Sequence, residues 1–119
     1  MTSDTEHRIQ RACVRWFSLE HRELRGRLFA VPNGGRRDAA TGARLKDEGV
    51  IPGVADLILL KSNRYYGALL IEMKAPGGRQ SESQKVWAES VCLWGEYKYV
   101  VCRSLDDFIR EVTDYLKED

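Results

Sequence analysis

Apolar and polar positions follow a helical period early in the chain and a strand pattern later. From Glu6 to Leu24, apolar side chains recur every three or four residues, which predicts a helix with one buried face. Two later segments, Asp56 to Leu60 and Ala68 to Lys74, are nearly continuous apolar runs. Because inner strands are covered on both faces, these runs predict two strands in the middle of a sheet.

Turn and capping residues delimit the remaining elements. Ser81 and Ser104 each stand where a helix N-cap is expected, and clusters of glycine and proline interrupt the apolar runs. The further predicted elements are a strand at 28–31, a short helix within 38–48, a helix over 81–94, a strand at 97–102 and a helix over 104–117. We therefore expect an α/β (α+β) fold of order α-β-(α)-β-β-α-β-α, with a mixed sheet flanked by helices in one domain spanning 1–119.

Composition is that of an ordinary water-soluble globular protein, with 43% hydrophobic and 31% charged residues. No apolar run approaches the roughly 20 residues that span a bilayer, and the N-terminus has no apolar signal core. Three cysteines, Cys13, Cys92 and Cys102, lie in apolar stretches without CxxC spacing, which favours reduced, buried thiols over a zinc site. These features predict a cytoplasmic protein that makes no membrane contact.

The net charge of +1 does not by itself indicate a nucleic-acid-binding protein, but the charge is unevenly distributed. Between Arg22 and Lys46 there are seven basic residues and two acidic ones, whereas 104–119 holds six acidic and two basic residues. Such polarity is what a protein needs to present one face to phosphate, although solvated faces also carry charge clusters.

Three charged residues stand at the ends of the predicted inner strands, where burial of a charge is costly. Asp56 begins one strand, and Glu72 and Lys74 end the next, two residues apart and therefore on one face. Glu-x-Lys also occurs by chance as a solvent-facing pair of little energetic value. Its position after an apolar run, together with Asp56 upstream, favours a functional cluster.

The chemistry that this cluster suits is metal-assisted hydrolysis. If the strands are neighbours, Asp56 and Glu72 come within reach of one hard cation such as Mg²⁺ or Mn²⁺. Such an ion polarises a phosphoryl oxygen and lowers the pKa of a bound water. Lys74 is placed to orient that water, take its proton or offset charge on the phosphate.

The chain resembles the VRR-NUC family, the virus-type replication-repair nucleases of the PD-(D/E)xK group, over nearly its whole length. Three blocks carry the resemblance, in family order: PGVADL at 52–57, IEMKAP at 71–76 and GRQSESQK at 78–85. The resemblance implies a restriction-endonuclease-like fold, with Asp56 and Glu72 as metal ligands, the backbone carbonyl of Met73 as a further ligand, and Lys74 serving the attacking water. In the wider group the proline and the aspartate are adjacent, whereas here three residues separate them, a spacing that this family accepts.

Two further residues each admit two interpretations. Gln84 fits a capping box with Ser81, whereas the resemblance implies a catalytic glutamine at this helix start. We do not expect one side chain to do both at once. Glu6 lies on the apolar stripe of the first helix and is either a first-turn acid favoured by the helix dipole or, as the resemblance implies, a residue that approaches the metal through water.

Candidate DNA contacts lie in two glycine-containing turns, where backbone N–H groups can approach phosphate and arginines can bind it. They are Asn33, Arg36, Arg37 and Arg79. Turns need glycine in any case, so these four residues are hypotheses rather than motif matches.

The function expected is Mg²⁺- or Mn²⁺-dependent endonucleolytic cleavage of DNA. The resemblance implies a homodimer acting on branched DNA such as Holliday junctions, in DNA repair, within a bacterial or phage-infected cytoplasm. Trp87, Val91 and Trp94 share a helical face suited to packing against a second subunit. The alternatives are a less selective or sequence-specific endonuclease with the same site, and a catalytically silent nucleic-acid-binding module.

Overall fold

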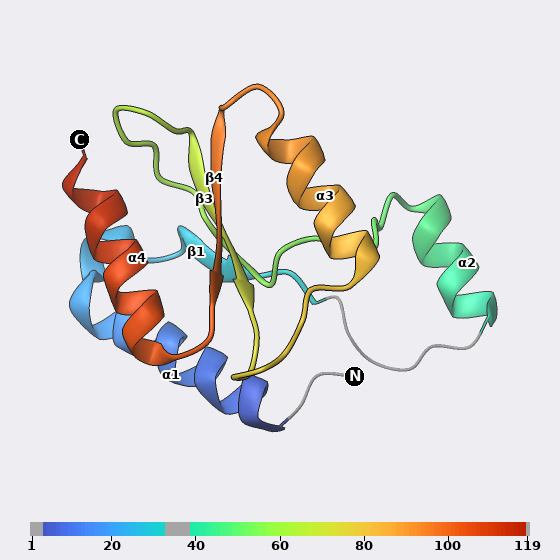
Figure 1. The fold of residues 1–119 in the computed structure, drawn as a ribbon, viewed down its shortest axis with the longest axis horizontal. Coiled ribbons are helices and arrows are strands. Elements are labelled where there is room, and N and C mark those ends of the chain that lie inside the picture. Colours follow the sequence, from blue (N-terminus) through green and yellow to red (C-terminus); the bar gives the residue numbers. More distant parts are fainter. Residues whose placement is uncertain (1–3, 33–38, 119) are drawn as a thin grey trace.

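A computed structural model of the chain describes residues 4–32 and 39–118. The elements are α1 (Asp4–Glu20), the short 3₁₀ helix η1 (Arg22–Leu24), β1 (Leu28–Ala30), α2 (Ala39–Asp47), β2 (Leu57–Leu59), β3 (Ala68–Met73), α3 (Glu82–Cys92), β4 (Tyr97–Cys102) and α4 (Leu105–Lys117) (Figure 1). Their order confirms the predicted α-β-(α)-β-β-α-β-α arrangement. The predicted first helix ends early, at Glu20, and its last residues form η1 instead.

The strands form one mixed sheet in the order β1-β2-β3-β4. β2 pairs antiparallel with both β1 and β3, whereas β3 and β4 run parallel. All six residues of β3 are buried, as expected for an inner strand. The predicted pair of inner strands is thus confirmed, and β2 and β3 are direct neighbours.

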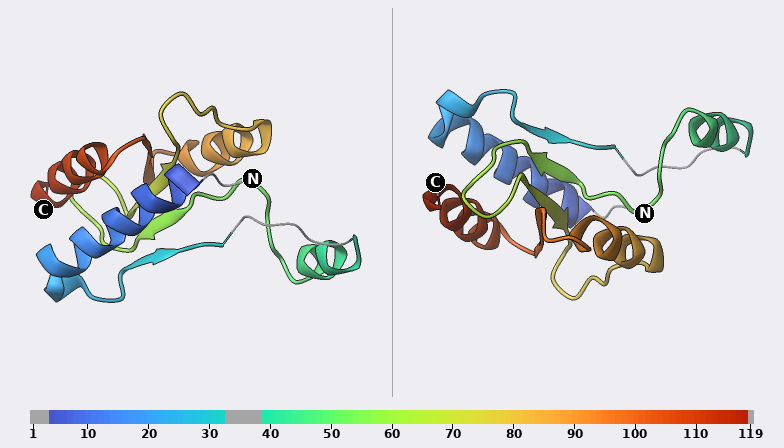
Figure 2. Two further views of the ribbon diagram at one scale, coloured as in Figure 1. Left: turned by 90° about the horizontal axis from the view of Figure 1, so that it is seen from below. Right: turned by 90° about the horizontal axis from the view of Figure 1, so that it is seen from above.

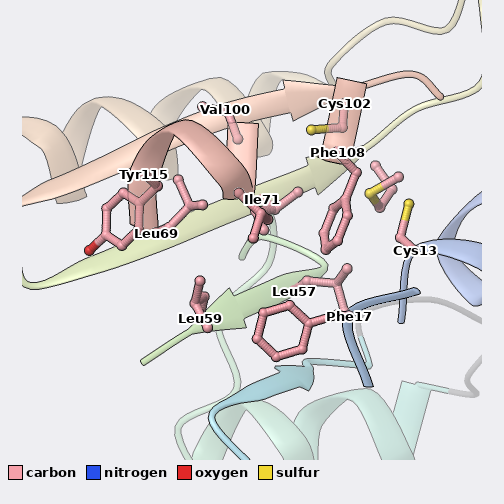
Figure 3. Packing of buried hydrophobic residues seen from close by; sticks show 12 residues of the cluster. Cys13, Phe17, Leu57, Leu59, Leu69, Ile71, Val100, Cys102, Phe108 and Tyr115 are labelled. Carbon is pink, nitrogen blue, oxygen red and sulfur yellow. The ribbon is translucent and has the colours of Figure 1, made fainter. Parts of the chain in front are cut away.

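Helices cover both faces of the sheet. α1 and α4 pack on one face, where Cys13, Phe17, Phe108 and Tyr115 meet the apolar side chains of β2 and β3 (Figure 3). α3 lies on the opposite side of β3 and β4 (Figure 1), and its Trp87 and Val91 pack against Ala68 and Leu70 of β3. This geometry corrects the expectation for the face of Trp87, Val91 and Trp94. Its first two residues cover the sheet, and only Trp94, which is 79% exposed, remains open.

The three cysteines are free thiols. Cys13 and Cys102 are buried in the core, and Cys92 on α3 is half-buried. None of the described helices is both long enough and apolar enough to cross a bilayer.

The segment between α2 and β2 returns from an outlying helix to the centre of the molecule. α2 has no buried residue and stands away from the sheet (Figures 1 and 2). At Gly53 the backbone has a φ of +83° and lies directly against Ser83 at the start of α3, so that a Cβ on Gly53 would overlap the Ser83 carbonyl group. Glycine is therefore required here for both its conformation and its size. The contact fixes the approach to Asp56 relative to α3.

Candidate active site

Asp56 and Glu72 meet where β2 begins and β3 ends, because the two strands are antiparallel neighbours. The Asp56 Oδ2 atom accepts a hydrogen bond from the backbone N–H of Met73, at 2.7 Å. Glu72 is only 1% exposed. Burial, and secondarily the adjacent Asp56 carboxyl group, raise the pKa of Glu72 to about 8. The sequence prediction that these two carboxyl groups come together is therefore correct.

Glu72 is held by contacts to both of its carboxyl oxygens. The Oε2 atom accepts a hydrogen bond from Gln84 Nε2 at 3.0 Å, and Lys74 Nζ lies 3.7 Å from the same oxygen. The Oε1 atom accepts a hydrogen bond from the Tyr99 hydroxyl at 3.3 Å. The Lys74 side chain is only 11% exposed, so this ion pair is largely shielded from water. Glu72 and Lys74 thus share one face, as strand alternation predicts.

Gln84 caps α3 and contacts Glu72 at the same time. Its Oε1 atom accepts a hydrogen bond from the backbone N–H of Ser81 at 2.8 Å, while the Ser81 hydroxyl accepts one from the N–H of Gln84 at 3.2 Å. Its Nε2 atom remains free to donate to Glu72. One side chain can make both contacts, contrary to the expectation, because the amide has an acceptor at one end and a donor at the other. A catalytic role of Gln84 stays a prediction.

Tyr99 and Gln80 are site residues that sequence reasoning missed. The Tyr99 hydroxyl, which donates to Glu72, accepts a hydrogen bond from Gln80 Nε2 at 3.0 Å. Burial, and then the Glu72 charge, raise the pKa of Tyr99 well above its ordinary range. Tyr99 reaches Glu72 because β3 and β4 pair in parallel, which sets Leu70 opposite Tyr99 and places the Tyr99 ring on the Glu72 face. Pairing register is not visible in a single sequence.

Arg103 was also missed. Its Nη1 atom donates to the backbone carbonyls of Gly78, at 2.6 Å, and Ala75, at 3.2 Å. These two carbonyls belong to the turn that follows Lys74. Arg103 therefore fixes the path of the chain between the cluster on β3 and the start of α3.

The remaining predicted residues lie around or outside this cluster. Arg79 is exposed, directly after the turn that Arg103 holds, whereas Asn33, Arg36 and Arg37 fall outside the described residues. Glu6 is half-buried in the first turn of α1. Within 4–32 and 39–118, no three or more His, Cys, Asp or Glu side chains are grouped to hold a metal ion, so Glu6 is not grouped with Asp56 and Glu72 there. A contact through water stays a prediction.

The donor set of the cluster fits a hard divalent cation. Asp56 and Glu72 present carboxylate oxygens, and the Lys74 ammonium group lies 3.7 Å from Glu72. Two facing carboxyl groups in a buried setting repel each other when both are ionised, which is part of the cause of the raised Glu72 pKa. A cation bound between them would remove this repulsion. The arrangement therefore fits Mg²⁺ or Mn²⁺ through the same residues that the sequence singles out.

Comparison with known proteins agrees with this geometry. The sequence profile of the VRR-NUC domain matches residues 4–106. A solved structure described as a VRR_NUC domain protein superimposes with a TM-score of 0.83 at 24% identity, covering 99% of this chain and 93% of the other. That likeness shows the fold, a mixed sheet with flanking helices of the restriction-endonuclease type. No match is found among curated proteins. Since the profile spans most of its length, the chain belongs to the VRR-NUC family, nucleases of the PD-(D/E)xK type.

Proposed function

We propose that the protein is a Mg²⁺- or Mn²⁺-dependent DNA endonuclease that hydrolyses phosphodiester bonds with an activated water. The observation that carries this proposal is the buried Glu72, which faces Asp56, lies next to Lys74, and is held through both oxygens. Burying an ionisable carboxyl group to 1% exposure costs stability even where its partners offset part of the cost, so the position of Glu72 beside Asp56 supports a role in binding a cation. The same cost argues against a catalytically silent module that merely kept the fold.

The ion would be held by the Asp56 and Glu72 carboxylates and the Met73 backbone carbonyl. When bound, such an ion supplies Lewis-acid stabilisation of the phosphate and a more acidic water. Gln84 and Tyr99 keep the Glu72 carboxylate from rotating out of position, because each occupies a different oxygen. Lys74, with its ammonium group beside Glu72, orients the attacking water and offsets negative charge that develops on the phosphate.

The substrate within this proposal is branched DNA, such as a Holliday junction, cut by a homodimer in bacterial or phage-infected cytoplasm during DNA repair. A two-fold dimer places two active sites on two symmetric strands. The alternative is a less selective endonuclease with the same site, which would cleave junction, flap and linear duplex alike.

The test is a nicking assay on labelled four-way junction, flap and linear duplex in Mg²⁺, Mn²⁺ or EDTA. We expect cleavage of the junction in either metal and none in EDTA. Asp56→Asn and Lys74→Ala should each reduce the rate by at least about 100-fold. Asp114→Asn and Lys117→Ala, which make the same changes on the exposed end of α4, should cleave like the wild type.

Each contrary outcome removes a defined part of the proposal. Cleavage in EDTA would contradict the metal mechanism, and full activity of Asp56→Asn would contradict the site. Equal rates on all three substrates would replace junction selectivity with the less selective alternative.

Metal binding can be measured without turnover. Tyr99→Phe keeps the ring, whose centroid lies 6.2 Å from that of Trp87, but removes the hydroxyl that bridges Gln80 and Glu72. Loss of such an outer contact typically weakens metal affinity or activity by about 10- to 100-fold. We expect titration of Mn²⁺ by calorimetry to show this loss in Tyr99→Phe. Unchanged affinity and unchanged cleavage would contradict the role given to Tyr99.

A further inference from the structure

The exposed face of α1 carries a stripe of arginines that the site described above does not use. Arg8, Arg11 and Arg15 are all exposed and follow one another at spacings of three and four residues. These spacings place them on one face of the helix. Cys13 and Phe17, which are buried in the core, define the opposite face. The three guanidinium groups therefore point to solvent as a group.

Nothing in the described part of the chain neutralises this stripe. The ion pairs there involve other residues, namely His21–Glu23, Lys74–Glu72, Lys98–Glu111 and Arg110–Asp107. Arg11 and Arg15 have no acidic residue three or four positions away on the helix, and Arg8 has only Asp4. Like charges at these spacings destabilise a helix. The stripe thus opposes the stability of α1 without a compensating partner within 4–32 and 39–118.

The stripe begins at the catalytic end of the sheet. Figure 3 shows Cys13 near Cys102, the last residue of β4, and Met73, the last residue of β3, belongs to the same buried cluster. The turns of α1 before Cys13 therefore lie at the end of the sheet where β3 delivers Glu72. Viewed from below, α1 runs across the front of the molecule with its outer side uncovered (Figure 2).

The length of the stripe suits a nucleic-acid backbone. At a rise of about 1.5 Å per residue, Arg8 and Arg15 are separated by about 10 Å along the helix axis. One strand of duplex DNA carries a phosphate every ~3.4 Å along its axis, so the stripe covers about three phosphate steps. Arginine binds phosphate oxygens bidentately, and three unpaired arginines in a row form a surface for successive phosphates rather than for one small anion.

We propose that Arg8, Arg11 and Arg15 form a binding surface for the phosphate backbone of duplex DNA that extends from the active site. This inference rests on the proposed function for the identity of the ligand. It adds a contact surface on α1 to the DNA contacts predicted at Asn33, Arg36, Arg37 and Arg79. The contacts are to phosphate, so they hold a duplex arm without reading its bases.

The test compares two triple variants that remove the same charge. Arg8→Gln/Arg11→Gln/Arg15→Gln removes the stripe, whereas Lys61→Gln/Arg64→Gln/Lys117→Gln removes three positive charges from the β2–β3 connection and the end of α4, at the other end of the sheet. Binding of a labelled four-way junction and a labelled 20-base-pair duplex is followed by fluorescence anisotropy in EDTA over a range of NaCl concentrations.

Each phosphate contact contributes about −0.9 to the slope of log affinity against log salt. We expect the stripe variant to flatten that slope by about 2 to 3 and to bind more than about 10-fold more weakly at 0.1 M NaCl. The control variant should retain the wild-type slope. Because the stripe is repulsive, the stripe variant should melt at the wild-type temperature or above it.

Cleavage measured on the same proteins separates this inference from the proposed function. In Mg²⁺ the stripe variant should raise KM and keep kcat within about two-fold, since no group at the reacting atoms is changed. An unchanged slope, or equal weakening in both triple variants, would overturn the inference while leaving cleavage by the wild type intact. If the stripe variant flattens the slope but the wild type never cleaves, the result would support the binding surface and overturn the nuclease proposal. A wild type that neither binds nor cleaves would overturn both.

Discussion

At the scale of single residues, Gln84 joins the start of α3 to the Glu72 carboxyl group. Its two contacts can be separated, because Ser81→Ala removes a cap hydrogen bond and leaves the Gln84 amide against Glu72. We expect Ser81→Ala to lower the free energy of unfolding by about 1 kcal/mol and to cleave within a few-fold of the wild type. Gln84→Ala should lose similar stability and at least about 10-fold in cleavage rate. Denaturant unfolding and the nicking assay measure the two effects.

Equal cleavage by the Ser81 and Gln84 variants would show that the glutamine only caps the helix. The sequence presents capping and catalysis as competing interpretations because it does not show which atoms of the amide face which partner. The distances of 2.8 Å to the Ser81 N–H and 3.0 Å to Glu72 assign one end to each.

The raised pKa of Glu72 gives the metal-free protein a defined dependence on pH. The folded state binds a proton at this carboxyl more tightly than the unfolded state, since its pKa is about 8 instead of the ordinary 4.5. Its contribution to stability is therefore full below pH 4.5 and is lost progressively as the pH rises to about 8. In EDTA, we expect the unfolding free energy of the wild type to fall over this range relative to Glu72→Gln. Parallel pH curves for the two proteins would contradict the raised pKa.

At the scale of elements, the turn at Gly53 sets how β2 and α3 meet. Gly53 and Gly49 both have positive φ, at +83° and +100°, so alanine is strained at either position. A Cβ at Gly49 would meet nothing within 4 Å, whereas one at Gly53 would overlap the Ser83 carbonyl group and approach the Gln84 nitrogen to 2.8 Å. The pair therefore isolates the close approach from the backbone conformation.

We expect Gly49→Ala to cost about 1 kcal/mol of unfolding free energy, for the left-handed conformation alone. Gly53→Ala should cost a further ~1–3 kcal/mol for the overlap, and it should slow cleavage because Gln84 moves with the start of α3. Chemical denaturation and the nicking assay on both variants provide the measurement. Equal losses of stability would mean that α3 shifts away freely from the turn.

The elements that the sequence predicts correctly are those defined by local patterns. β4 begins and ends as predicted, at Tyr97 and Cys102, and α4 is capped by Ser104 as expected, because apolar periodicity and capping depend on residues close in the chain. The place of Tyr99 beside Glu72 depends instead on the register between β3 and β4, and the contact of Gly53 with Ser83 depends on a loop that returns from α2. Such long-range placements carry no local signature.

At the scale of the whole molecule, the surface left open by α3 bears on the proposed homodimer. With Trp87 and Val91 committed to the sheet, the exposed apolar side chains of this region are Val86, Leu93 and Trp94, at 58%, 68% and 79% exposure. Exposed apolar residues that gather on one element favour a protein–protein contact. We therefore predict that the dimer forms through the end of α3 that carries Leu93 and Trp94.

A matched pair of leucines tests this prediction, because Leu93 and Leu19 are both 68% exposed and lie on different helical ends. A charge at either position should leave the monomer fold nearly unchanged, since neither side chain is buried. In sedimentation velocity at micromolar concentration, we expect Leu19→Glu to be dimeric, like the wild type. Leu93→Glu should shift toward monomer. Paired cuts of the junction should then decline in Leu93→Glu more than single nicks, because one monomer carries one active site. A wild type that is monomeric throughout would contradict the homodimer, and dissociation of Leu19→Glu instead would move the contact to the end of α1.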